Sequence, residues 1–283
     1  TLASAALTGL PVMHTHFDLP TTALGILRAD CPHYYRCHNE GESASEFVQR
    51  IVNNLEQLIL AEGADTIAAF GRSARAAREL GFDAVEIHGA HGYLIDQFLR
   101  DSTNLREDEY GGSAENRTRF LREVLTAIID VWGKDRVGVR LSPNGETQGC
   151  DDSDPATTFG AAARVVEELG AAFLELREPG PEGTFGSTDV PKQSPLIRQI
   201  YTGPLVLNSD YSADEAVADI EAGRADAVSW GRDFISNPDL PTRLRTGAPI
   251  APNVNVPHSW YGKGPAGYID YPTLTEQEHI AAG

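Results

Sequence analysis

The architecture is easiest to recognise from residues 82–99, "FDAVEIHGAHGYLIDQFL". The segment 84–87 predicts a short buried strand, and three polar ring side chains, His88, His91 and Tyr93, follow where that strand should end. In parallel α/β proteins the carboxyl ends of the strands carry the functional side chains. This segment therefore predicts both a strand and a candidate site at its carboxyl end.

Composition narrows the class of protein. The 283 residues contain 23 Lys and Arg against 41 Asp and Glu, a net charge of -18. Such a surface repels phosphate backbones and anionic lipids, so we expect neither nucleic-acid nor membrane binding. No apolar run approaches the roughly 18 residues of a membrane span, and the first residues lack the basic start of a signal peptide. Three cysteines without CxxC spacing indicate a reducing, cytoplasmic setting.

From about residue 66 onward, helical and strand patterns alternate. Amphipathic stretches predict helices over 65–80, 113–133, 155–170, 194–201, 212–224 and 238–247. Short apolar runs predict strands beginning near residues 84, 137, 171, 205 and 227. This alternation is typical of βαβ units in a parallel sheet. A Rossmann fold is the rival, but no GxGxxG follows a strand, so we favour a (β/α)8 TIM-type barrel.

The start of the chain does not fit a complete barrel. Residues 1–83 would have to supply three strands, and two predicted helices already occupy much of that length. We therefore expect an incomplete barrel, with strands 4–8 present and strands 1–3 replaced.

Four sets of polar residues carry candidate chemistry. His88 and His91 can together grip one carbonyl or anionic oxygen, with the Tyr93 phenol as a proton donor; alternatively all three are packed core residues. Arg140, in "GVRLSP", needs either an anion or polar ring system, or a structural ion pair with Glu86 or Glu175.

The other two sets are a phosphate site and a metal site. The segments "NSDY" and "SWGRDF" place Ser209, Asp210, Gly231 and Arg232 after the last two strands, where barrels bind phosphate. In "VMHTHFD", His14 and His16 with Asp18 have the H-x-H pattern of a metal-dependent hydrolase, although no matching strand-end Asp is evident.

Long motifs in residues 70–274 closely resemble the C-terminal part of the old yellow enzyme family, the FMN-dependent ene reductases. They are the run over 86–124, "EIHGAHGYLIDQFLRDSTNLREDEYGGSAENRTRFLREV", with "VGVRLSP", "LVLNSDY", "SWGRDFISNPDLPTRL" and "WYGKGPAGYIDYPTL". The resemblance implies FMN as cofactor and NAD(P)H as co-substrate, for reduction of activated C=C or nitro compounds.

The resemblance also implies roles for single residues. His88 and His91 match the pair that binds the activating oxygen of the substrate, and Tyr93 matches the proton donor. Arg140 matches the arginine beside the flavin N1–C2=O edge. The remaining matches are to the FMN phosphate site, by Ser209, Asp210, Gly231 and Arg232, and to the pocket wall, by Tyr268.

Residues 1–65 are different: "TGLPVMHTHFDLP" and the stretch after it resemble an internal fragment of a class III pyridoxal-phosphate-dependent aminotransferase. We therefore expect a chimera, with residues 1–65 as a fragment without independent folding and residues 66–283 as a partial FMN-binding barrel. Three outcomes stay open: an ene reductase, either active or impaired by the missing strands, an inactive partial barrel that binds no FMN, and a metal-dependent hydrolase that uses His14 and His16. The open strand edges at 84–88 and 227–230 predict a homo-oligomer.

Overall fold

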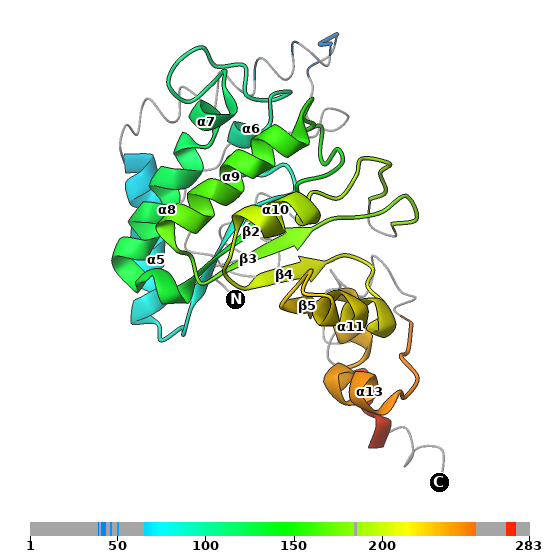
Figure 1. Cartoon of the computed structure of the whole chain (residues 1–283). Coiled ribbons are helices and arrows are strands. Elements are labelled where there is room, and N and C mark those ends of the chain that lie inside the picture. The colour runs from blue at the N-terminus through cyan, green and yellow to red at the C-terminus, as the bar shows by residue number, and fades with distance from the viewer. Residues whose placement is uncertain are drawn as a thin grey trace.

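The computed structural model describes residues 65–183, 186–252 and 270–275, with single positions between 39 and 50. Five strands in this part form one parallel sheet in chain order (Figure 1): β1 (Val85–Gly89), β2 (Val137–Leu141), β3 (Phe173–Arg177), β4 (Leu205–Asn208) and β5 (Ala227–Ser229). All five predicted strands are thus confirmed. The residues expected to replace strands 1–3 lie outside the described part of the chain, so the incompleteness of the barrel stays a prediction.

Helices alternate with these strands. They are α5 (Asp65–Glu79), α6 (Leu94–Leu99), α7 (Ala114–Arg117), α8 (Arg119–Trp132), the 3-10 helix η1 (Lys134–Arg136), α9 (Pro155–Leu169), α10 (Ser194–Ile200), α11 (Ala213–Glu221), α12 (Arg232–Ser236) and α13 (Leu240–Thr246). The short helices α6 and α12 were not predicted. None of the described helices is long and apolar enough to cross a membrane.

Capping residues explain the helix boundaries. Asp154 accepts a hydrogen bond from the backbone N–H of Thr157 at 3.1 Å, and the left-handed Gly170 (φ 66°) ends α9. The single helix predicted over 113–133 is instead two helices, α7 and α8. The Thr118 hydroxyl donates to the Glu115 carbonyl at 2.8 Å, and such a bond to the preceding turn bends a helix.

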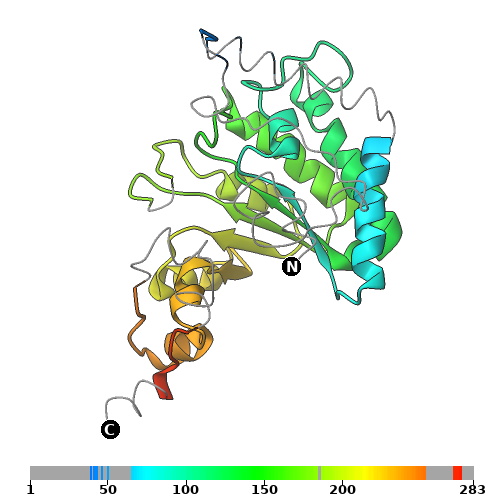
Figure 2. The same ribbon diagram turned by 180° about the vertical axis from the view of Figure 1, so that it is seen from behind.

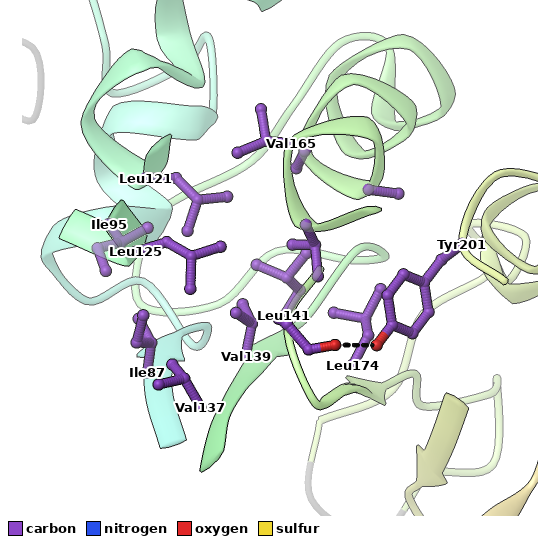
Figure 3. Close-up of a cluster of buried hydrophobic side chains, with 14 of the residues drawn as sticks. Ile87, Ile95, Leu121, Leu125, Val137, Val139, Leu141, Val165, Leu174 and Tyr201 are labelled. Carbon is purple, nitrogen blue, oxygen red and sulfur yellow. Dashed lines mark hydrogen bonds between the residues drawn. The ribbon is translucent and has the colours of Figure 1, made fainter. Parts of the chain in front are cut away.

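One face of the sheet packs against helices α5, α8 and α9, which lie together on one side in Figures 1 and 2. The core there is apolar, and Figure 3 shows Leu121 and Leu125 of α8 above Val139 and Leu141 of β2. The only polar contact drawn in Figure 3 belongs to Tyr201, whose hydroxyl donates to a backbone carbonyl at 2.8 Å. Burial of this apolar surface is the main stabilising contribution to the fold.

The other face of the sheet is polar. Because successive strand residues point to opposite faces, the neighbours of the core residues point away from the helices. On this open face the register aligns His88 of β1 with Arg140 of β2 and Glu175 of β3, and Asn208 of β4 with Ser229 of β5. All five residues stay partly or largely exposed. In a closed barrel this face lines the interior, and its carboxyl rim carries the site.

Candidate active site

His88, His91 and Tyr93 form a cluster at the carboxyl end of β1. The His88 ring lies 5.2 Å from the His91 ring and 5.2 Å from the Tyr93 ring, centre to centre. His88 is the penultimate residue of β1, His91 lies in the turn that follows, and Tyr93 immediately precedes α6. Neither imidazole donates to, or accepts from, a described residue. The alternative of packed histidines satisfied by the backbone therefore has no contact to support it within the described residues.

The turn that carries His91 has a strained backbone conformation held by neighbouring groups. His91 has φ 59°, a left-handed value uncommon for a non-glycine residue. Its N–H donates to the Ser142 hydroxyl at 2.9 Å, and its carbonyl accepts from the Gln148 amide at 2.7 Å. At Gly92 (φ 72°), a Cβ would lie 2.6 Å from the Thr147 carbonyl oxygen. Only glycine fits here, so the loop after β2 fixes where the His91 ring points.

A buried ion pair between Asp96 and Arg100 stabilises this turn. Arg100 Nε lies 3.0 Å from Asp96 Oδ1, and the other carboxylate oxygen of Asp96 accepts from the Gly92 N–H at 2.8 Å. Arg100 also donates to the carbonyls of Gly145, at 3.0 Å, and Ser142. Burial raises the pKa of Asp96, while the Arg100 guanidinium opposes that shift. The pair thus joins the loops after β1 and β2 into one unit.

The imidazoles are neutral near neutral pH. Burial, and secondarily the positive charge of Arg140, lowers the pKa of His88 to about 4 and that of His91 to about 3. His88 lies on the open face, where water screens part of this effect. A neutral imidazole carries one N–H donor, so the two rings can offer two donors to one oxygen.

Arg140 forms the structural ion pair that its sequence position left open, and it can still contact a ligand. Its Nε lies 3.4 Å from Glu175 Oε1, and its Nη2 donates to the Asn208 side-chain oxygen at 2.9 Å. The side chain keeps 25% of its surface exposed, on the same open face as His88. The structural ion pair therefore exists, and the guanidinium still faces the rim of the sheet.

The residues predicted to bind phosphate also come together. Ser209 (φ 115°) and Asp210 (φ 48°) follow β4 with left-handed backbone, and Arg232 forms an ion pair with Asp210. Gly231 directly precedes Arg232 and is exposed. Turns with left-handed residues and backbone N–H groups beside an arginine are common elements of anion-binding sites.

Arg177, at the end of β3, was not among the predicted site residues. It is 6% exposed, and burial lowers its pKa, with Arg140 and Arg232 adding to the shift and Asp210 opposing it. Three guanidinium groups, from the carboxyl ends of β2 and β3 and from the turn after β5, therefore lie close enough to influence one another electrostatically. A sequence signal existed, since a buried arginine at a predicted strand end needs an anion or a partner.

Other predicted residues cannot be placed. Tyr268, His14 and His16 lie outside the described residues. Within the described ranges, no group of three or more His, Cys, Asp or Glu side chains could hold a metal ion.

The donor set at the rim fits a flat, polar and anionic cofactor. Arg140 offers N–H donors beside the histidines, and the turn after β4 together with Arg232 offers donors for a phosphate. Cationic and backbone donors of this kind, spread over neighbouring strand ends, match the ring edge and the phosphate of a flavin mononucleotide.

A parallel α/β sheet with polar donors at its carboxyl rim is the arrangement found in barrel-type enzymes that bind anionic cofactors. The chain belongs to the NADH:flavin oxidoreductase / NADH oxidase family, whose sequence profile matches residues 21–250. This family, which includes the old yellow enzymes, uses FMN with NAD(P)H as the reductant. Its fold is the TIM barrel, to which the five parallel strands of this sheet conform.

Solved structures and curated proteins agree with this assignment. The chain is 51% identical to the old yellow enzyme homologue of Zymomonas mobilis, with a TM-score of 0.74 over 76% of this chain and 60% of that one. It is 38% identical to morphinone reductase, with a TM-score of 0.70 over 75% of this chain and 56% of that one. It is 41% identical to 12-oxophytodienoate reductase 1 of Oryza sativa subsp. japonica, covering 73% of this chain and 54% of that one.

The chain spans about half to two thirds of the length of the curated relatives it matches. The family match begins at residue 21 and so overlaps residues 21–65 of the segment expected to derive from an aminotransferase. That origin, and the boundary near residue 65, stay predictions.

Proposed function

We propose that this chain is an FMN-dependent oxidoreductase that uses NAD(P)H to reduce activated C=C or nitro compounds. The observation that carries the proposal is the cluster of His88, His91 and Tyr93 on the rim that also holds Arg140: the His91 and Tyr93 rings each lie 5.2 Å from the His88 ring, centre to centre. The substrate is a small molecule, and cysteine usage supports a cytoplasmic setting.

His88 and His91 bind the oxygen of the activating carbonyl or nitro group. Both rings stay uncharged near neutral pH, so each donates one N–H to that oxygen and stabilises the negative charge that develops on it during reduction. The hydrogen bonds of the His91 backbone to Ser142 and Gln148 hold the donor in place before the substrate arrives.

Tyr93 supplies the proton. Its ring centre lies 5.2 Å from that of His88, which places the phenol beside the group that binds the substrate oxygen. A phenol in this position transfers a proton to the carbon next to the activating group.

The cofactor, when bound, supplies the hydride chemistry. Arg140 would hold the polar edge of its ring system. Its phosphate would be held by Arg232 and by the backbone around Ser209, Asp210 and Gly231. Tyr268 is proposed as part of the pocket wall.

A second candidate is a partial barrel that binds no FMN. Within the described residues, β1 and β5 each pair with one neighbouring strand, which leaves two sheet edges to be covered. On this reading strands 1–3 are replaced by residues 1–65, part of the cofactor site is lost, and chains associate through the open edges.

Titration of the purified chain with FMN separates the two candidates. An active or impaired reductase acquires the visible absorbance of bound flavin with a measurable Kd, and the Arg232→Ala variant weakens that Kd about tenfold through loss of a charge-assisted contact. The matched control is Arg122→Ala, which removes an arginine on α8 that pairs with Glu168 away from the rim. Colourless protein that light scattering shows to be oligomeric would support the partial barrel instead.

Activity tests the assigned roles. With flavin bound, Tyr93→Phe should lower turnover of an activated alkene by at least about 100-fold while FMN binding is kept, because only the proton donor is lost. Unchanged turnover in that variant would remove Tyr93 from the mechanism.

A further inference from the structure

A closed ring of polar contacts joins four side chains on the open face of strands β2 to β5. The Asn208 side-chain oxygen accepts from Arg140 Nη2 at 2.9 Å, and its amide donates to the Ser229 carbonyl at 2.9 Å and hydroxyl at 3.0 Å. The Ser229 hydroxyl donates to Glu175 Oε1 at 2.8 Å. That same carboxylate oxygen lies 3.4 Å from Arg140 Nε, which closes the ring.

Each contact in this ring can run in only one direction. A guanidinium only donates, so the amide oxygen of Asn208 must face Arg140, and its amide nitrogen must face Ser229. The carbonyl of Ser229 and the carboxylate of Glu175 only accept. The ring therefore has a single arrangement: Nη2 of Arg140 is held by its hydrogen bond to Asn208, and Nε, which makes no hydrogen bond to a described residue, lies at ion-pair distance from Glu175. Nη1 makes no hydrogen bond to any described residue and is left for a ligand.

Glu175 is the acidic side chain of the ring, and it is largely buried. Its side chain is 13% exposed, against 25% for Arg140, so little water separates the two charges. Two further titratable groups face this pair, Glu86 and His88 of β1. Arg177 lies close enough to Arg140 to feel its charge.

We propose that Glu175 is a positioning residue that orients Arg140 and attenuates the positive charge which Arg140 presents to the flavin ring. The inference rests on the FMN site proposed above. With Glu175 ionised, Arg140 is held in a fixed direction and its charge is partly compensated. Reduction adds negative charge to the flavin, which the positive charge of Arg140 stabilises. The negative charge of Glu175 weakens this stabilisation and so lowers the preference for the reduced state.

The test is the midpoint potential of bound FMN in Glu175→Gln, measured at pH 8, where Glu86 is ionised. The amide keeps the size of the side chain and an acceptor oxygen for Ser229, but it removes the negative charge. We expect the equilibrium to shift about tenfold toward reduced FMN, which is about 30 mV for a two-electron couple. The Kd for oxidised FMN should change less than threefold.

Glu168→Gln is the matched control, because it removes one negative charge from the exposed outer face of α9. A second variant, Glu175→Asp, keeps the charge but withdraws it by one methylene, and it should raise the potential by less than Glu175→Gln. It serves as the test if Glu175→Gln does not give the wild-type circular dichroism spectrum.

The outcomes separate this inference from the proposed function. Wild-type protein that takes up no FMN overturns the proposed function and this inference with it. Wild-type protein that binds FMN, with Glu175→Gln and Glu175→Asp at the potential of the Glu168→Gln control, overturns the inference alone and leaves Glu175 as a structural partner.

Discussion

The two faces of the sheet are built from the same strands, but one face forms the apolar core and the other carries the polar candidate site. On the helix-covered face, Ile87, Val139 and Leu174 pack with almost no exposed surface. Their neighbours one residue further along, His88, Arg140 and Glu175, keep part of their surface on the open face. Apolar packing on the helix-covered face stabilises the sheet. The rigid sheet in turn holds the polar groups of the open face in fixed positions.

The largest effect should come from the buried ion pair that stabilises the His91 turn. Asp96→Ala leaves the fully buried Arg100 without its carboxylate, and an uncompensated buried charge costs about 3–5 kcal/mol of unfolding free energy. Urea unfolding followed by circular dichroism measures this loss.

The double variant Asp96→Leu with Arg100→Met is the control, because it removes both charges and keeps apolar volume. It should be more stable than Asp96→Ala. If the single variant lost less than about 1 kcal/mol, Arg100 would not depend on Asp96.

Two adjacent residues of β4 compare the faces directly. Leu207 is 3% exposed on the helix-covered face, and Leu207→Ala should cost about 2–5 kcal/mol because it leaves a cavity in the core. Val206, half-buried on the open face, should lose less than about half as much in Val206→Ala. Denaturant midpoints of the two variants measure the difference, and equal losses would mean that both faces are packed alike.

A smaller effect should appear on acidification. The pKa of His91 is lowered from 6.5 to about 3 in the folded protein, so the unfolded chain takes up a proton first as the pH falls. Folding stability due to this group therefore declines from about pH 6.5 down to about pH 3. In His91→Asn the fall in Tm over this range should be shallower. Parallel Tm curves for wild type and variant would show that the ring titrates normally.

The smallest effect should come from a carboxyl on the open face. Burial, together with the neighbouring carboxyl of Glu175, raises the pKa of Glu86 to about 7. A raised carboxyl pKa stabilises the fold at low pH, and this contribution is lost as the pH rises through about 7. Glu86→Gln should make the decline of Tm above pH 5 less steep. The corresponding change in unfolding free energy should be under about 1 kcal/mol, because water screens this exposed group.

The control for Glu86→Gln is Asp83→Asn, which removes a carboxyl from the exposed turn before β1 without altering the sheet face. A decline just as steep in Glu86→Gln as in Asp83→Asn would show that the charge of Glu86 does not matter to the sheet.

Local signals predicted much of the fold because they are local in origin. Short apolar runs gave the five strands, and amphipathic stretches gave helices whose ends agree with the structure to within about three residues, apart from the split into α7 and α8. The break at Thr118 was missed, since a hydroxyl bond to the preceding turn leaves no mark in the hydrophobic period. The short α6 and α12 were missed because so few residues show no periodicity.

The candidate site was predicted in part. His88, His91, Tyr93, Arg140 and Arg232 were selected from their positions after strands, and the structure brings them to one rim. Arg177 was missed, although an arginine at a predicted strand end was a signal that the sequence offered. Their roles await the measurements above.

By itself, the sequence determined the parallel α/β class, the strand positions and the family motifs, because propensity, hydrophobic period and motif spacing are properties of neighbouring residues. Tertiary structure alone decided that Arg140, Glu175, Asn208 and Ser229 close into one ring. These residues are up to 89 positions apart in the chain, from 140 to 229. Only the register of the parallel strands places their side chains side by side, and register depends on the packing of the whole sheet.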